Sequence, residues 1–126
     1  MSINEHVNVM FVDDDEVTGS VMKRNCDNSN FSCTIFDNAE QCLDEFMSQP
    51  ADLVITDLRM PGMNGFQATR QISKASETSS IPVIMVTTKD QETDKVWAMR
   101  QGAKDYIVKP VQEKALIEHV NMVLSA

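Results

Sequence analysis

Two segments of the chain, "LVIT" (Leu53–Thr56) and "PVIMVT" (Pro82–Thr87), are largely apolar and lack the alternation of a half-exposed strand. A short run of this kind is typical of a strand that is covered on both faces. Such strands belong mostly to parallel sheets, in which helices return the chain from one strand to the next. The pattern therefore restricts the chain to an α/β fold.

Segments with helical periodicity separate five strand-like runs. The expected strands are Val7–Val12, Phe31–Phe36, Leu53–Thr56, Pro82–Thr87 and Asp105–Val108. The expected helices are Glu16–Cys26, Ala39–Ser48 with Asn38 as N-cap, a segment after Gly65, a segment that Asp90 caps and Gly102 stops, and Gln112–Leu124. This (βα)5 alternation predicts a parallel sheet with helices on both faces and right-handed crossovers.

The helical periodicity also predicts which side chains share an apolar face. These are Val17, Val21 and Met22 in the first helix, Leu43, Phe46 and Met47 in the second, Phe66, Thr69 and Ile72 in the third, and Leu116, Ile117, Val120, Val123 and Leu124 in the last. We expect these faces to pack against the sheet.

Length and composition narrow the function classes. A chain of 126 residues that is 42% hydrophobic is expected to form one domain over residues 1–126. The net charge of −8 opposes direct binding to nucleic acid. Three cysteines without a CxxC pair favour reduced thiols, and no apolar run approaches the roughly 20 residues of a membrane span. We therefore expect a cytoplasmic protein without membrane insertion.

Polar side chains follow four of the predicted strands. Asp13 and Asp14 come after the first strand and Asp57 after the third, while Thr87 closes the fourth and Lys109 follows the fifth. Ligands of doubly wound sheets bind beyond the carboxyl ends of the strands, so these side chains are expected to meet at one edge.

The chemistry of this set suits a phosphoryl group. Clustered carboxylates repel one another unless a cation joins them, and carboxylate oxygens suit Mg²⁺. Lys109 offers a positive charge and Thr87 a hydroxyl donor to phosphoryl oxygens. An Asp carboxylate is a known covalent acceptor of phosphoryl groups, and phosphoryl transfer depends mainly on positioning and charge neutralisation.

Four motifs in this order give the chain a resemblance to a known family. They are "VDDD" after the first strand, "DLRMPGMNG" after the third, "VTT" at the fourth and "KP" at the fifth. With them the sequence resembles the CheY-like receiver domain of two-component response regulators along essentially its whole length. The resemblance implies a flavodoxin-like, doubly wound five-stranded sheet with strand order 2-1-3-4-5.

The resemblance also implies roles for individual residues. Asp57 is the expected phosphoryl acceptor, and Thr87 and Lys109 are expected to hold the phosphoryl oxygens. The implied Mg²⁺ ligands are Asp13, Asp14, Asp57 and the backbone carbonyl of Arg59.

Further family features concern the switch and its loops. Tyr106 matches the aromatic residue that changes rotamer when Thr87 moves. Pro110 matches a proline of the family whose preceding peptide bond is cis, which would aim Lys109 inward. A cis bond is plausible at this position because X–Pro bonds adopt cis at low cost. Gly65 is expected to supply backbone freedom in the loop after the acceptor.

The implied function is phosphorelay signalling rather than conventional enzyme activity. A histidine kinase or phosphotransfer domain donates the phosphoryl group, and the receiver catalyses both its own phosphorylation and its dephosphorylation. The predicted face of the fourth helix, fifth strand and fifth helix then exchanges protein partners. The partly exposed position expected of Trp97 on the fourth helix suits such a face.

A narrower resemblance covers Gly65–Val111. This stretch is similar to stand-alone receivers of the type IV pilus chemosensory systems that govern twitching motility, and "TTKDQETDKVW" carries much of the similarity. It implies a downstream pilus or motility protein as partner, or a role as a phosphate sink beside a second receiver.

Two alternatives stay open from the sequence. "DDDEV" matches the D-x-D-x-[VT] motif of haloacid-dehalogenase-like phosphatases, which would make Asp13 the nucleophile and Asp15 the acid. Asp15 is otherwise expected to be a solvated extra acid or a helix N-cap. A phosphorylation-independent scaffold with the same fold is the second alternative.

Overall fold

Strands and helices alternate along the chain in the computed structural model, which describes residues 7–27, 31–58, 62–76, 78–88, 92–109 and 111–125. The strands are β1 (Val7–Val12), β2 (Phe31–Phe36), β3 (Leu53–Asp57), β4 (Val83–Thr87) and β5 (Asp105–Val108). The helices are α1 (Glu16–Asp27), α2 (Ala39–Ser48), α3 (Gly65–Lys74), α4 (Glu92–Arg100) and α5 (Glu113–Ser125). Each predicted element is present at nearly its predicted bounds.

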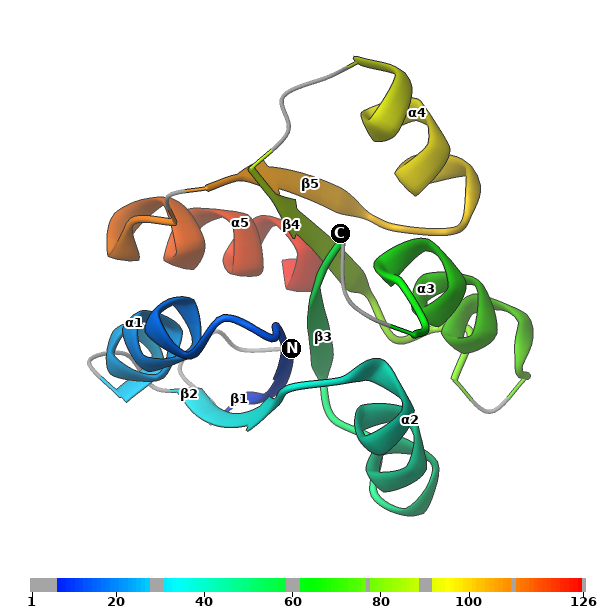
Figure 1. Ribbon diagram of the computed structural model, residues 1–126, viewed down its shortest axis with the longest axis horizontal. Coiled ribbons are helices and arrows are strands. Elements are labelled where there is room, and N and C mark those ends of the chain that lie inside the picture. The colour runs from blue at the N-terminus through cyan, green and yellow to red at the C-terminus, as the bar shows by residue number, and fades with distance from the viewer. Residues whose placement is uncertain are drawn as a thin grey trace.

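The five strands form one parallel sheet in the order β2-β1-β3-β4-β5 (Figure 1). β1 pairs with both β2 and β3, so Val12 lies opposite Phe36 on one side and Thr56 on the other. Every residue of β3 and β4 is buried, as expected of strands covered on both faces. The predicted strand order is confirmed, and the carboxyl ends of all five strands lie at one edge.

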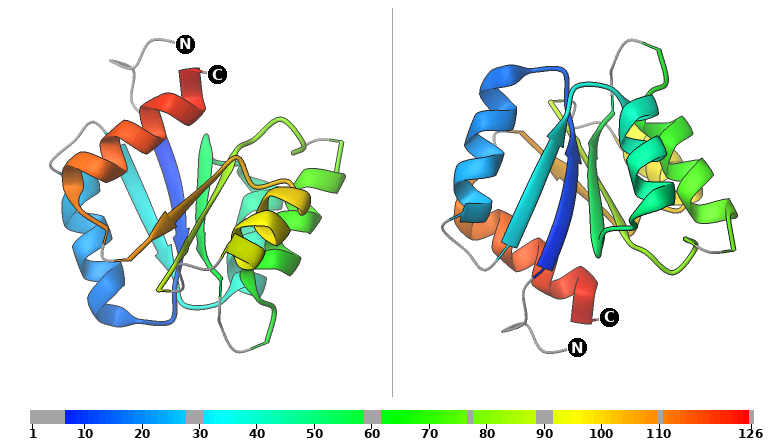
Figure 2. Two further views of the ribbon diagram at one scale, coloured as in Figure 1. Left: turned by 90° about the horizontal axis from the view of Figure 1, so that it is seen from above. Right: turned by 90° about the horizontal axis from the view of Figure 1, so that it is seen from below.

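Helices cover both faces of the sheet. α1 and α5 lie on one face, and α2, α3 and α4 lie on the other (Figure 2). The core under α1 and α5 includes Phe11, Ile55 and Leu116, and the core under α2 and α3 includes Phe46 and Ile72. A third, smaller cluster packs beneath α4 and consists of Leu58, Met85, Ala98, Ala103 and Tyr106, with Phe66 and Val108 against it. None of the helices that the structure describes is long and apolar enough to cross a bilayer.

The predicted faces of α3 and α5 are confirmed. Thr69 and Ile72 are fully buried, and Phe66 is half-buried against the third cluster. In α5, Leu116 and Val120 have no exposed surface, and Ile117, Val123 and Leu124 pack against the first cluster.

The predicted faces of α1 and α2 are wrong in part. Val17 is 71% exposed and Val21 39% exposed, because α1 turns a different face to the sheet. That buried face consists of Gly19, Met22, Asn25 and Cys26. Met47 is also exposed, since it follows the buried Phe46 by about 100° around α2.

The helix ends predicted at Asn38 and Gly102 are confirmed, and a cap that was not predicted is found at Asn64. The Asn38 side chain accepts a hydrogen bond from the Gln41 backbone N–H at 2.9 Å and so caps α2. Asn64 and Gln67 form a reciprocal capping box at the start of α3. Gly102 follows α4 with a φ of 110°, a value that only glycine adopts easily. The predicted cap Asp90 lies outside the described residues.

Candidate functional site

Three carboxylates converge at the carboxyl edge of the sheet. Asp13 and Asp14 follow β1, Asp57 ends β3, and these two strands are neighbours. One carboxylate oxygen from each residue lies within 4.8 Å of the other two. Asp13 and Asp57 are buried while Asp14 is exposed, so the cluster is open to solvent on the side of Asp14.

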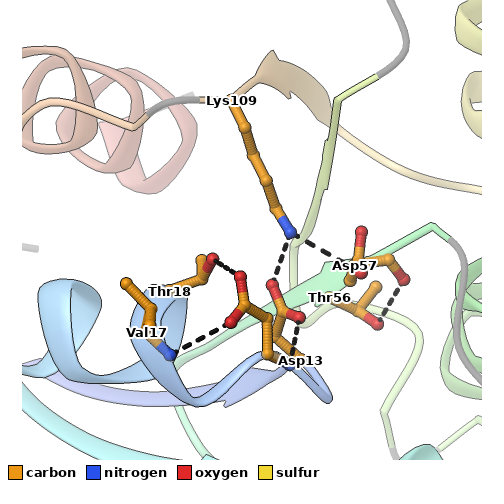
Figure 3. Close-up of polar contacts among 7 residues, drawn as sticks. Asp13, Val17, Thr18, Thr56, Asp57 and Lys109 are labelled. Carbon is orange, nitrogen blue, oxygen red and sulfur yellow. Dashed lines mark hydrogen bonds and ion pairs between the residues drawn. The ribbon is translucent and has the colours of Figure 1, made fainter.

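Lys109 joins the two buried acids of this cluster. Its side chain extends from the end of β5 toward Asp13 and Asp57 (Figure 3). The ammonium Nζ lies 2.6 Å from Asp13 Oδ2 and 3.6 Å from Asp57 Oδ2. The other Asp13 oxygen, Oδ1, accepts a hydrogen bond of 2.9 Å from the Asp15 backbone N–H. Both carboxylate oxygens of Asp13 therefore have a partner, whereas Asp57 lies farther from the ammonium than Asp13 does.

The pKa values of Asp57 and Lys109 reflect the excess of carboxylates over ammonium groups in this cluster. Burial and, after it, the neighbouring charge of Asp13 raise the pKa of Asp57 to about 6, because Lys109 only partly opposes these two effects. Burial alone would lower the pKa of Lys109, but the hydrogen bond to Asp13 and the charge of Asp57 outweigh it and raise the pKa above its ordinary value. Lys109 is therefore charged at neutral pH, and Asp57 is ionised there at a cost in free energy.

The donor set fits Mg²⁺. Three carboxylate oxygens within 4.8 Å of one another are hard ligands. The raised pKa of Asp57 shows that its ionised form is disfavoured, and a bound cation would stabilise that form. The open side at Asp14 leaves room for the water ligands that Mg²⁺ retains. Receiver domains with such an acidic pocket typically bind Mg²⁺. Arg59, expected to add a carbonyl ligand, lies outside the described residues.

Thr87 and Tyr106 lie on the side of the site that leads toward α4. Thr87 ends β4 and is buried, one residue beyond the position opposite Asp57 and directly opposite Val108 of β5. Its backbone carbonyl accepts a 2.7 Å hydrogen bond from the Lys109 N–H. Tyr106 is buried in the third cluster, which also contains Leu58, the residue after Asp57.

Asp15 is turned toward α1 rather than toward the other acids. Its carboxylate accepts hydrogen bonds from the Thr18 hydroxyl at 2.7 Å and from the Val17 backbone N–H at 3.1 Å. These bonds, that of Thr18 first, lower the pKa of Asp15. The expectation of an N-cap is confirmed, and this geometry gives no support to Asp15 as the acid of a phosphatase.

The structure contradicts the expectation that Gly65 supplies backbone freedom. Gly65 is the first residue of α3 and has no positive φ, so backbone freedom is not what it supplies. A Cβ atom there would lie 2.3 Å from the Asp57 carbonyl oxygen and 2.7 Å from Met85 Sδ. Glycine instead allows α3 to begin directly against the end of β3. Pro110, expected to orient Lys109, lies outside the described residues.

One contact was missed by sequence reasoning, namely the short ion pair between Lys109 and Asp13. Lys109 was expected to face phosphoryl oxygens, not a carboxylate of the acid pair. The signal was present in the sequence, since one cation at the end of a strand shares an edge with several acids. Coulomb attraction then brings the ammonium to the most buried partner in reach.

Comparisons with known proteins place this geometry in a family. The model of the response regulator receiver domain matches residues 9–121. The chain is 65% identical to Protein PilH of Pseudomonas aeruginosa over 74 residues, which are 59% of this chain and 61% of that protein. It is 36% identical to the sensory transduction protein RegX3 of Mycolicibacterium smegmatis over 116 residues, covering 92% of this chain and 50% of that protein. The chain thus spans between half and three fifths of these curated relatives.

A solved structure agrees with the fold. The chemotaxis protein CheY4 of Vibrio cholerae superposes with a TM-score of 0.89 at 22% identity, covering 94% of this chain and 99% of that one. This likeness confirms the CheY-like, flavodoxin-like sheet. The match to Protein PilH agrees with the narrower resemblance drawn from Gly65–Val111. The motifs and fold of the present chain, together with the family match, show that it belongs to the response regulator receiver domain family of two-component signalling.

Proposed function

We propose that residues 1–126 form one receiver domain that works as a phosphorylation switch, with Asp57 as the phosphoryl acceptor. The observation that carries this proposal is the placement of Asp57. Its buried carboxylate has a raised pKa, shares a cluster with Asp13 and Asp14, and lies 3.6 Å from the ammonium of Lys109. A nucleophile, a metal-binding acid set and a phosphate-binding cation are thus within one small volume.

The transfer requires little more than positioning and charge neutralisation. A carboxylate oxygen of Asp57 bonds to the phosphorus of a phosphohistidine as the nitrogen–phosphorus bond breaks, and the donor imidazole keeps the electron pair. A pKa of about 6 leaves Asp57 mostly ionised at pH 7. Lys109 and the Thr87 hydroxyl hold the phosphoryl oxygens. Asp13, Asp14 and Asp57, with the Arg59 carbonyl, would hold Mg²⁺, which when bound would supply the further positive charge.

The proposed switch depends on the residues that lie between the phosphoryl site and α4. Thr87 is drawn to the phosphoryl group, and Tyr106 changes rotamer after it. Tyr106 shares the third cluster with Leu58 beside the acceptor and with Ala98 of α4, so a local change of charge can alter packing under that helix. The face of α4, β5 and α5 then exchanges protein partners.

The pathway proposed is the control of twitching motility by type IV pili. The similarity to Protein PilH and the stretch Gly65–Val111 support it. The donor is a histidine kinase or a phosphotransfer domain, and the protein itself is cytoplasmic. The partner is a pilus or motility protein, or else the receiver drains phosphoryl groups from a second receiver.

The deciding experiment is the intact mass after incubation with a small-molecule phosphodonor, with and without Mg²⁺. We expect one added phosphoryl group on the wild type, dependent on Mg²⁺ and absent from Asp57→Asn. Asp44→Asn, which changes an exposed acid on α2, is the matched control and should be phosphorylated like the wild type.

Two outcomes would overturn the proposal. A label that persists in Asp57→Asn and is lost in Asp13→Asn would move the nucleophile to Asp13 and favour the phosphatase. A wild type that stays unmodified by both a small donor and a panel of histidine kinases would favour the phosphorylation-independent scaffold.

A further inference from the structure

A groove with a volume of about 530 Å³ lies between α3 and the C-terminal end of α4, away from the acid cluster. The two helices belong to the layer on the opposite face of the sheet from α1 and α5 (Figure 2). Its walls include Arg70, Ser73 and Lys74 from α3, and Trp97, Arg100 and Gly102 from α4 and its end. Neither the motifs nor the phosphoryl site accounts for this combination.

The charge of the groove is opposite to that of the molecule. The chain carries 19 acids against 11 Lys and Arg, yet Arg70, Lys74 and Arg100 all line this groove. None of the acidic residues that the structure describes lines it. Lys74 and Arg100 lie in the last turns of their helices, where a cation interacts favourably with the helix dipole. That local role does not account for Arg70.

The groove also presents an exposed aromatic ring. Trp97 is 53% exposed, and its neighbours Val96 and Met99 are 42% and 45% exposed. The guanidinium of Arg100 lies 5.8 Å from the centre of the Trp97 ring, within the range of a cation–π contact. Tryptophan and arginine are the side chains most enriched at the energetic centres of protein interfaces.

The wall between the two helices is closely packed. A Cβ atom on Gly102 would lie 2.1 Å from Ser73 Oγ, so glycine is what lets the end of α4 approach α3. One end of the groove is therefore closed by a direct approach of Gly102, after α4, to Ser73 of α3.

We propose that the α3–α4 groove, lined by Arg70, Lys74, Trp97 and Arg100, binds an acidic segment of a partner protein. Carboxylates of that segment pair with Arg70 and Lys74, and one aromatic or aliphatic side chain packs on Trp97. Charge complementarity selects this occupant over a nucleic acid, because an extended polyanion would also meet the acids on the rest of the surface. The groove lies outside the phosphoryl site, and this binding does not require phosphorylation of Asp57.

Trp97 provides the readout, because it is the single tryptophan of the chain. The probes are short tryptophan-free peptides rich in Glu with one Phe or Leu, and matched peptides with Lys at every Glu position. We expect the acidic peptides to change Trp97 fluorescence to saturation, with affinity about tenfold lower in high salt. The basic peptides should leave the fluorescence unchanged.

Matched charge reversals locate the site. Arg70→Glu changes an exposed wall residue and should weaken acidic-peptide binding at least about tenfold. Lys114→Glu makes the same kind of reversal at an exposed position of α5 and should bind like the wild type. Circular dichroism of both variants checks that the fold is intact.

The proposal is overturned by any of five results. Acidic and basic peptides could change the fluorescence equally, or no probe could change it. Arg70→Glu could bind the acidic peptides as tightly as Lys114→Glu does. Sedimentation could show a dimer that Arg70→Glu dissociates, which would make the groove a contact between copies. A DNA duplex could bind more tightly than the acidic peptides.

Discussion

α4 and α5 flank the same edge strand, β5, and are attached to the molecule in opposite ways. α5 has five apolar residues in the first core cluster or against it, with Leu116 and Val120 fully buried. Among the α4 side chains that the structure describes, only Ala98 is buried. Val96, Trp97 and Met99 instead point to solvent.

This difference teaches where stability and partner binding are located. Burial of apolar surface contributes about 25 cal/mol per Å², so α5 adds much more to the free energy of unfolding than α4 does. A helix held by one small side chain can shift at little cost, and its exposed apolar residues are available to partners. The cluster under α4 also contains Leu58 and Tyr106, and Leu58 directly follows Asp57 at the end of β3.

The largest effect is expected from Leu116→Ala in α5. Removing a fully buried Leu side chain leaves a cavity and should lower the free energy of unfolding by about 3 kcal/mol, measured by urea unfolding. Met99→Ala in α4 is the counterpart and should cost less than about 0.5 kcal/mol. Equal costs for the two variants would break the comparison.

The next effect is expected where α4 is attached to α3. Gly102→Ala puts a Cβ against Ser73 and forces alanine to a φ of 110°, so it should cost about 2 kcal/mol in urea unfolding. Gly62→Ala is the control, because Gly62 also has a positive φ of 75° but faces only the flexible end of Glu40. If Gly102→Ala costs no more than Gly62→Ala, the close approach of the two helices carries little of the stability.

Neutralising Asp57 should change the free energy of unfolding in the opposite direction. In the folded state the pKa of Asp57, about 6, is above its ordinary value of 3.8, so its contribution to stability is fully present below pH 3.8 and is lost as pH rises through 6. With a chelator present to remove divalent cations, Asp57→Asn should therefore raise the free energy of unfolding at pH 7 by about 1 to 2 kcal/mol. This value is smaller than the full pKa shift would give, because solvent screens the charge.

The pH dependence separates this cause from others. The gain from Asp57→Asn should disappear below about pH 4, where both states of the wild type are protonated. Asp44→Asn on the exposed face of α2 should show no such dependence. A gain that persists at low pH would show that packing, not charge, limits stability at this site.

The smallest effect is expected from Trp97→Ala. It removes a half-exposed ring and an exposed cation–π contact, so the free energy of unfolding should change by less than about 1 kcal/mol. Chemical denaturation followed by circular dichroism gives the value without relying on tryptophan fluorescence. A loss approaching that of Leu116→Ala would mean that α4 is anchored through Trp97 after all.

The strands were predictable because their physics is local. Leu53–Thr56 and Pro82–Thr87 are covered on both faces, so nothing interrupts their apolar runs. Helix faces were harder to predict where the inward side is small or polar. α1 turns Gly19 and Asn25 to the sheet, and hydrophobic periodicity gives such residues no weight.

The convergence of Asp13, Asp14, Asp57 and Lys109 was predictable because topology alone brings strand ends together. The direction of the Lys109 side chain was not, since it depends on which buried carboxylate offers the better ion pair. The reason for Gly65 was equally hidden, because it depends on the distance between a helix and a strand. The chemical roles of these residues remain predictions until the phosphorylation experiment is done.

The order of the strands has a consequence for synthesis on the ribosome. Asp13, Asp14 and Asp57 all lie in the first half of the chain, and β3 can pair with β1 before β4 and β5 have been made. Lys109 arrives only after the last strand. A nascent chain that ends before β5 therefore has the three acids without the ammonium that joins two of them. The last strand to emerge completes an edge of the sheet and also relieves the repulsion left by the first half.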